Sequence, residues 1–250
     1  MHERVAFIVE GLTRRADPAR AGQMARYMKT TMPFHGVARP DLDKVVRDAL
    51  RRWPIESLDD YRTTVHALWA LPHREEKYAA IAIARRQERF VRAENLDLYR
   101  SMIVGGAWWD LVDDFAHVVC HLLLTDRART RPVLDAWIDD DDLWLRRIAI
   151  LSQIDAKNET DEEMLFSYCT RHMSEREFFI RKAIGWALRQ YARTSPDAVL
   201  AFCEANRERM SGLTFREATK HLERPNPAVI APKTPENVDH PRLAQRDPPS

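Results

Sequence analysis

The sequence is poor in glycine, cysteine and net charge, and it lacks the patterns that mark several large classes of protein. Only 7 of its 250 residues are glycine, 3 are cysteine, and the formal net charge is +1. No segment alternates apolar and polar residues like a half-buried strand, and no glycine-rich loop resembles those that cradle phosphate groups. No apolar stretch reaches the 18 residues typical of a transmembrane helix, and the N-terminal apolar run is too short for a signal peptide. We therefore expect a cytoplasmic protein without strands and without a membrane partner.

The cysteines and histidines do not form a recognisable disulfide framework or metal site. The cysteines are widely spaced and odd in number, which is typical of reduced thiols in or near a core. They are Cys120, Cys169 and Cys203. Asp113, His117 and His121 recur every four residues, but no second cluster supplies the further ligands of a tetrahedral zinc. The sequence predicts no metal and no cofactor.

Helical periodicity dominates what remains. We expect about a dozen helices of 10–20 residues joined by short links. Their start signals are Asp17-Pro18, Arg39-Pro40-Asp41, Ser57 with Asp60, Ser174 with Glu177 as a capping box, and Ser195-Pro196. These signals predict an all-α domain over residues 1–224. Residues 225–250 hold seven of the 14 prolines and are expected to be extended or disordered.

The run 106–115 places an indole and a carboxylate at the edge of a helical apolar stripe. The stripe consists of Trp108, Leu111, Val112, Phe115, Val119 and Leu122. Trp109 and Asp113 are four residues apart and lie together, about a third of a turn from the stripe's centre. A ring face beside a negative charge suits a cationic ligand. Alternatively, the Trp completes packing and the Asp favours the positive end of the helix dipole.

A cation lies within the edge of a second stripe, at residues 142–154. Arg147 projects beside Leu151 and Ile154, whereas Arg146 points away from them. A guanidinium in such a place needs a planar anionic partner. That partner is either a carboxylate, such as Asp113 or Asp142, or a phosphate group, and both remain open.

A third helix, over residues 174–191, has Trp186 at the edge of its core stripe. Lys182 and Arg189 lie beside Trp186 on the outward side, one turn before and after it. Gly185 removes a side chain next to the ring, so another surface can approach closely. A ring framed by two cations is typical of a nucleic-acid contact, in which the cations meet phosphates.

Basic residues gather in the second half of these segments although the net charge is small. They are Arg146, Arg147, Lys157, Arg181, Lys182, Arg189 and Arg193. Because phosphate contacts dominate affinity for DNA, this distribution predicts weak nonspecific binding that depends strongly on salt. The alternative is an ordinary solvated charged surface.

Five motifs together resemble one known family, the AlkD-like DNA alkylation repair enzymes. They are MARYMKTTMPFHGV at 24–37, WWDLVD at 108–113, WLRRIAIL at 144–151, EFFIRKAIGWALRQYART at 177–194 and REATKHL at 216–222. The resemblance covers residues 1 to about 224, in order. It implies a curved right-handed solenoid of HEAT-like antiparallel helix pairs with a concave DNA-binding face. It also implies a monofunctional DNA glycosylase, monomeric and nucleoid-associated.

The implied reaction is hydrolysis of the N-glycosidic bond of cationic N3- or N7-alkylated purines in duplex DNA. These bases leave as neutral molecules, so no general acid is needed. The resemblance also implies that the lesion is held stacked rather than flipped out. The family assignments make Asp113 the stabiliser of the oxocarbenium-like sugar and give the cationic nucleotide the ring faces of Trp109 and Trp186. The expected DNA contacts are Arg147, Tyr27, Lys182, Arg189 and Lys157.

Two departures and two alternatives accompany this resemblance. Residues 105–107 offer no side chain for a phosphate contact. Asp114 adds a second carboxylate, which is expected to point outward but would raise the pKa of Asp113 if it turned inward. The alternatives are a non-catalytic binder of damaged or branched DNA and a helical-repeat scaffold for protein partners.

Overall fold

Every regular element in the described part of the chain, residues 3–222 of a computed structural model, is a helix. The α-helices are α1 (Glu3–Thr13), α2 (Pro18–Met28), α3 (Arg39–Arg52), α4 (Leu58–Trp69), α5 (Arg74–Arg86), α6 (Leu96–Gly106), α7 (Trp109–Thr125), α8 (Arg127–Trp137), α9 (Leu143–Leu151), α10 (Glu162–His172), α11 (Phe178–Tyr191), α12 (Pro196–Ala205) and α13 (Gly212–Thr219). Three 3₁₀ turns join them: η1 (Glu88–Phe90), η2 (Ala93–Asn95) and η3 (Lys157–Glu159).

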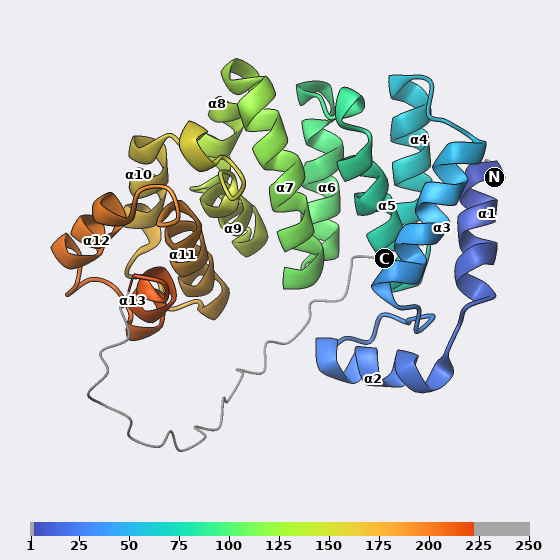
Figure 1. Cartoon of the computed structure of the whole chain (residues 1–250), viewed down its shortest axis with the longest axis horizontal. Coiled ribbons are helices and arrows are strands. Elements are labelled where there is room, and N and C mark those ends of the chain that lie inside the picture. The colour runs from blue at the N-terminus through green and yellow to red at the C-terminus, as the bar shows by residue number, and fades with distance from the viewer. Residues whose placement is uncertain (1–2, 223–250) are drawn as a thin grey trace.

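The helices form two layers in an arched row. Helices α1, α3, α5, α7, α9, α11 and α13 each contact the next along the row, and helices α4 to α12 with even numbers pack against them from the other side. Figure 1 shows the row running from α1 at one end to α13 at the other, with α2 set apart below it. The predicted all-α solenoid is confirmed. No helix within residues 3–222 is long and apolar enough to cross a membrane.

The core follows the predicted apolar stripes. In α7 the side chains of Leu111, Val112, Phe115, Val119 and Leu122 are all fully buried. Helix α5 is enclosed on every side, since residues 79–84 have no exposed surface. A helix surrounded by apolar neighbours lies at the centre of a larger packing unit. The three cysteines are buried and free, as predicted.

Most predicted helix starts are confirmed, and two details are wrong. Asp17 and Ser57 cap α2 and α4 by accepting backbone N–H groups at 3.0 and 3.1 Å. The capping box from Ser174 to Glu177 does not form, because the helix begins later, at Phe178. Trp108 is not part of α7 but its extended N-cap, so its ring reaches Trp144 and Phe179 instead of continuing the stripe.

Helix α2 is attached to the row by its N-cap, by the loop that follows it and by partly buried side chains such as Met24 and Met28. None of its residues is buried. The N–H of Asp17 donates to the carbonyl of His35 at 2.8 Å. Gly36 has a φ of +84°, and a Cβ there would lie 2.1 Å from the Asp17 carbonyl oxygen, so only glycine fits this crossing. The predicted domain boundary at 224 and the proline-rich segment 225–250 lie outside the described residues.

Candidate nucleic-acid interface

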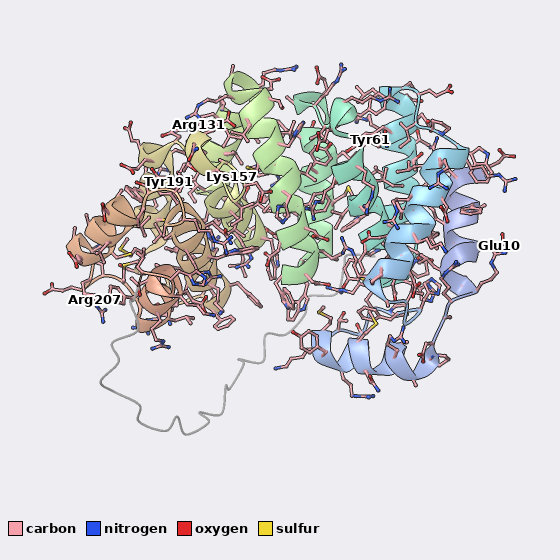
Figure 2. The ribbon with its side chains drawn as sticks, viewed as in Figure 1. Glu10, Tyr61, Arg131, Lys157, Tyr191 and Arg207 are labelled. Carbon is pink, nitrogen blue, oxygen red and sulfur yellow. The ribbon has the colours of Figure 1, made fainter. Side chains whose placement is uncertain are left out.

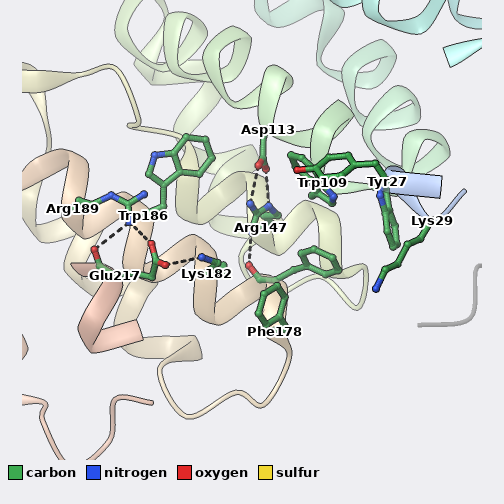
Figure 3. A pocket seen from close by; sticks show the side chains of 12 residues that line it. Tyr27, Lys29, Trp109, Asp113, Arg147, Phe178, Lys182, Trp186, Arg189 and Glu217 are labelled. Carbon is green, nitrogen blue, oxygen red and sulfur yellow. Dashed lines mark hydrogen bonds and ion pairs between the residues drawn. The ribbon is translucent and has the colours of Figure 1, made fainter. Parts of the chain in front are cut away.

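A hollow of about 330 Å³ brings together residues from five helices and the residue after α2. Its walls are Tyr27, Lys29, Trp108, Trp109, Asp113, Arg147, Phe178, Phe179, Lys182, Trp186, Arg189 and Glu217. Figure 3 shows Asp113 above the centre, with Trp109 and Tyr27 on one side and Trp186 on the other. Seven of the eight predicted site residues therefore line one hollow.

The two predicted indoles each keep one part in the core and one part in the hollow. Trp109 is the first residue of α7, and Trp186 lies in the middle of α11. Both are partly buried and pack against the apolar core. Core packing fixes the rings while their remaining surface lines the hollow. The packing and ligand-binding interpretations of these residues are thus compatible.

Asp113 and Arg147 form a two-pronged ion pair across the floor of the hollow. Nε and Nη2 of Arg147 donate to the two Asp113 oxygens at 2.7 and 2.9 Å, and Nη1 donates to the Phe179 carbonyl. The Arg147 side chain is 5% exposed and that of Asp113 is 17% exposed. Of the two partners left open for Arg147, the structure contains the carboxylate. The carboxylate also borders the hollow, so the pair is not hidden in the core.

Burial raises the pKa of Asp113 above its ordinary value of 3.8. Arg147 opposes this shift, while the neighbouring carboxylates of Asp110 and Asp114 add to it. The raised pKa means that this carboxylate holds its proton more tightly than a free Asp does. Its negative charge is therefore lost at a higher pH than that of a free Asp.

The two neighbouring carboxylates have cationic partners of their own. Asp110 accepts from Nε of Arg74 at 2.8 Å and from the Tyr78 hydroxyl. Asp114 accepts from Arg39 and Arg85, both at 3.1 Å. Asp114 is thus paired with arginines other than Arg147, and its charge contributes to the raised pKa of Asp113, the effect expected if it turned inward.

The cations that frame Trp186 are joined by one carboxylate from α13. Glu217 accepts from Nζ of Lys182 at 2.6 Å and from Nη1 of Arg189. Gly185 makes this contact possible, since a Cβ at that position would lie 2.5 Å from the Glu217 Cβ. The predicted close approach at Gly185 is present. Glu217 was not among the predicted site residues, although it lies in the family-like motif at 216–222.

The end of α2 supplies the far wall of the hollow. Tyr27 is 74% exposed and was predicted as a DNA contact. Lys29, which the sequence analysis missed, follows the helix in a left-handed conformation, with φ of 50°. The signal available for Lys29 was only its place two residues after Tyr27. Lys157 lies in η3, outside this hollow (Figure 2), and its DNA contact stays a prediction.

A second hollow of about 400 Å³ lies beside the first and shares Trp109, Asp113 and Trp186 with it. It reaches Asp114 and His117, and the His117 ring pairs with Asp155. The Asp113–His117–His121 series considered as a metal site therefore has its first two members paired elsewhere. Together the two hollows make a groove along the start of α7, lined by aromatic rings, a carboxylate and cations. Such a groove can accept a cationic, flat group and neighbouring phosphates.

The sequence pattern of one family, described as DNA alkylation repair enzyme, matches residues 8–222. The chain belongs to the DNA alkylation repair enzyme family. This membership agrees with the resemblance seen in the sequence. Comparison with curated protein sequences gave no match.

The chain is also similar to several solved structures. The chain is similar to a predicted DNA alkylation repair enzyme from Enterococcus faecalis, with 26% identity and a TM-score of 0.77 over 83% of this chain and 97% of that one. The smu.31 protein of Streptococcus mutans UA159 is 15% identical, with a TM-score of 0.56 over 81% and 98% of the two chains. This second likeness shows the shared fold.

A third structure is the alkylpurine DNA glycosylase AlkC of Pseudomonas fluorescens, bound to DNA containing an abasic site analog. It is 17% identical, with a TM-score of 0.47 over 88% of this chain and 62% of that one.

Proposed function

We propose that this protein is a monofunctional DNA glycosylase that hydrolyses the N-glycosidic bond of N3- and N7-alkylated purines in duplex DNA. The observation that carries the proposal is the meeting of Trp109, Trp186 and Asp113 around one hollow bordered by cations. Family membership makes DNA the expected partner. The proposal treats residues 1–224 as one domain that acts as a monomer.

Asp113 is the proposed catalytic residue. As the bond to a cationic base breaks, positive charge moves to the sugar, and a fixed carboxylate stabilises that charge and orients the attacking water. Arg147 holds both carboxylate oxygens from below, so the carboxylate is positioned before the substrate arrives. Arg147 uses three of its five N–H groups in its present bonds, and its direct contact with a phosphate stays a prediction.

The two indoles supply surfaces that favour a cationic nucleotide. Cations are attracted to the face of an aromatic ring, most strongly to Trp. Trp109 and Trp186 would contact the lesion and its deoxyribose from both sides of Asp113. An open groove between fixed rings is compatible with a lesion that stays stacked, as the family resemblance implies.

The cations around the hollow are the proposed phosphate contacts. Lys182 and Arg189 flank Trp186, and Lys29 and Tyr27 face them across the hollow. Glu217 holds the first two in the free protein, so DNA has to share or replace that carboxylate. This competition agrees with the weak, salt-sensitive binding that the net charge predicts.

The proposal is tested by incubating the protein with alkylated duplex DNA and measuring free 7-methylguanine and 3-methyladenine by chromatography. We expect release of both bases above the spontaneous rate. Binding of the DNA without release would support the non-catalytic binder instead. Absence of both binding and release would support the protein scaffold.

A further inference from the structure

Two imidazoles and one carboxylate meet where the loop after α2 packs on the start of α5. His35 lies in that loop, His73 is the N-cap of α5, and Glu76 lies in its first turn. Nε2 of His35 is 3.2 Å from Oε1 of Glu76, and Nδ1 of His73 is 3.5 Å from the same oxygen. The three ligand atoms all lie within 4.8 Å of one another. We call these three residues the His-Glu cluster.

The carboxylate of the cluster is buried without an ion pair to a lysine or arginine. The Glu76 side chain is 3% exposed, and its ion-pair partners within residues 3–222 are His35 and His73. Nζ of the neighbouring Lys77 donates instead to the carbonyls of Trp69 and Leu71, at 2.7 and 2.8 Å. A buried charge is stable only when it is paired. Oε2 of Glu76 accepts the backbone N–H of His73 at 2.8 Å, so a cation bound between the imidazoles would add a counter-charge to hydrogen bonds already made.

One ring nitrogen of the cluster has an ion-pair contact but makes no hydrogen bond. Nδ1 of His73 is buried and has no hydrogen bond. The ring stacks on that of His35, with centroids 3.8 Å apart and planes 19° from parallel. A buried nitrogen that makes no hydrogen bond is destabilising. A metal ion bound to its lone pair would satisfy it.

We propose that the His-Glu cluster binds a divalent transition metal, with Zn²⁺ as the ion that fits best. Zinc bonds of about 2.0–2.2 Å to nitrogen and oxygen place neighbouring tetrahedral ligands about 3.3–3.5 Å apart. The two distances to Glu76 are 3.2 and 3.5 Å. Two imidazoles and one carboxylate are a ligand set that zinc accepts, with water in the fourth position. The His73 side chain, 31% exposed, leaves solvent access for that water.

Binding requires only a small adjustment of the rings. Stacked imidazoles point their lone pairs in similar directions, so one ring must tilt toward the ion. The χ2 angle of histidine is broad, which permits this tilt. His35 and His73 are 38 residues apart and meet only through the fold, so no sequence spacing marks them as a pair of ligands.

The proposed ion would stiffen the attachment of α2. The carboxylate of Glu75 already accepts the backbone N–H groups of residues 35, 36 and 37, at 2.9, 2.7 and 3.0 Å. The carbonyl of His35 in turn holds Asp17 at the start of α2. A metal bridging His35 to α5 would add a second tie at this point. Helix α2 carries Tyr27, so the ion would steady one wall of the groove.

The test uses full-length protein without a histidine tag, stripped with a chelator and dialysed. Zinc is titrated by calorimetry, and Co²⁺ is used as a coloured substitute whose visible spectrum reports tetrahedral binding. We expect one ion per chain and a rise in Tm of about 5–10 °C at a hundredfold excess of zinc over Kd. Trypsin cleavage after Arg26 should slow when zinc is bound.

Two variants and one control make the site specific. His73→Asn removes a ligand but keeps a residue type that is favoured as an N-cap. Glu76→Gln removes the carboxylate but keeps an oxygen that accepts the backbone N–H of His73. Each should weaken zinc binding by at least ~10–100-fold, whereas the exposed His66→Asn should not change it. Substoichiometric zinc binding by the wild type, or unchanged binding in folded His73→Asn, would overturn the proposal. Neither measurement involves base release, so the zinc proposal and the glycosylase proposal can fail independently of each other.

Discussion

Three carboxylates at the start of α7 lie within five residues of one another, and of these Asp113 alone lines both hollows. The pairs they form are Asp110 with Arg74, Asp113 with Arg147, and Asp114 with Arg39 and Arg85. The arginines come from α3, α5 and α9, so each carboxylate is both neutralised and held in one orientation. Asp113 is the member that borders both hollows together with Trp109 and Trp186. Its position on the helix, and not its residue type, therefore distinguishes Asp113 from the other two as the candidate catalytic residue.

The raised pKa of Asp113 predicts the acid side of the pH profile. Asp113 acts in its ionised form, so base release should fall as the pH drops through a pKa above the ordinary 3.8. In Asp114→Asn a neighbouring negative charge is lost, which lowers the pKa of Asp113 and moves the acid limb to lower pH. Single-turnover rates across the acid range, corrected for spontaneous loss of bases, check this. A limb that moves to higher pH, or does not move, would contradict it.

Helical spacing was enough to find the main residues of the site but not their partners. Trp109 and Asp113 share a helix, so counting residues placed them together. The bond from Arg147 to Asp113 crosses 34 residues, and the sequence left it open against a phosphate. Glu217 and Lys29 were missed because a lone charged residue near a helix end has no spacing that marks it.

At the scale of elements, the contact between α11 and α13 closes one side of the groove. Gly185 on α11 allows it, since Glu217 Cβ and the Thr214 carbonyl occupy the space of a side chain. The sequence predicted a close approach at this glycine but could not say which segment approaches. The partner is fixed only when the chain folds back after α12.

Gly185→Ala should therefore destabilise the protein. The added methyl group would lie 2.5 Å from Glu217 Cβ, which is too close for relaxation without moving α13. We expect a loss of about 1–3 kcal/mol in the free energy of unfolding, measured by urea denaturation. The matched control is Gly22→Ala on exposed α2, where the nearest atom is the end of the Arg26 side chain at 3.4 Å. That change should stabilise by about 0.5–1 kcal/mol, and equal effects of the two substitutions would refute this account.

The late start of α11 shows how tertiary contacts override a local signal. Ser174 and Glu177 have the spacing of a capping box, but the residues between them are held elsewhere. Glu175 accepts from Arg146 at 2.8 Å and from His172 at 2.9 Å. These bonds keep the segment out of the helix. The signals at Asp17 and Ser57 had no such competition and were predicted correctly.

At the scale of the whole molecule, the charge balance is nearly even, and affinity for DNA depends on which cations are available. Glu217 occupies Lys182 and Arg189 in the free protein. Burial alone would raise the pKa of Glu217, but its hydrogen bonds from the two cations lower it overall. Glu217 is thus ionised at neutral pH and masks part of the basic surface.

Removing this mask should strengthen binding to undamaged DNA. In Glu217→Gln, Lys182 and Arg189 are free to meet phosphates, so affinity at low salt should rise several-fold. The slope of log K against log salt should steepen by about 0.9 for each phosphate gained. Fluorescence anisotropy over a salt series measures both quantities. Glu163→Gln, an exposed residue on α10, makes the same change in net charge away from the groove. An equal effect in both variants would show that Glu217 does not mask a DNA contact.

The arched arrangement and the family could be predicted because five long motifs resemble those of the family, in the same order along the chain. The His-Glu cluster and the place of Lys157 could not, since both depend on how distant loops pack. Lys157 lies in η3, outside the hollow, although the sequence grouped it with the basic residues there. The salt series described for Glu217→Gln would also test the predicted DNA contact of Lys157.

The central claim is that the Asp113 carboxylate performs the chemistry, and the most direct measurement is the single-turnover rate of 7-methylguanine release by Asp113→Asn. Saturating protein and neutral pH separate the rate from binding, and circular dichroism confirms that the variant is folded, since breaking the pair with Arg147 should cost about 3 kcal/mol. We predict a rate ~10²–10³-fold below wild type with DNA binding retained, and a rate near wild type for Asp114→Asn. Release by folded Asp113→Asn at the wild-type rate would contradict the account.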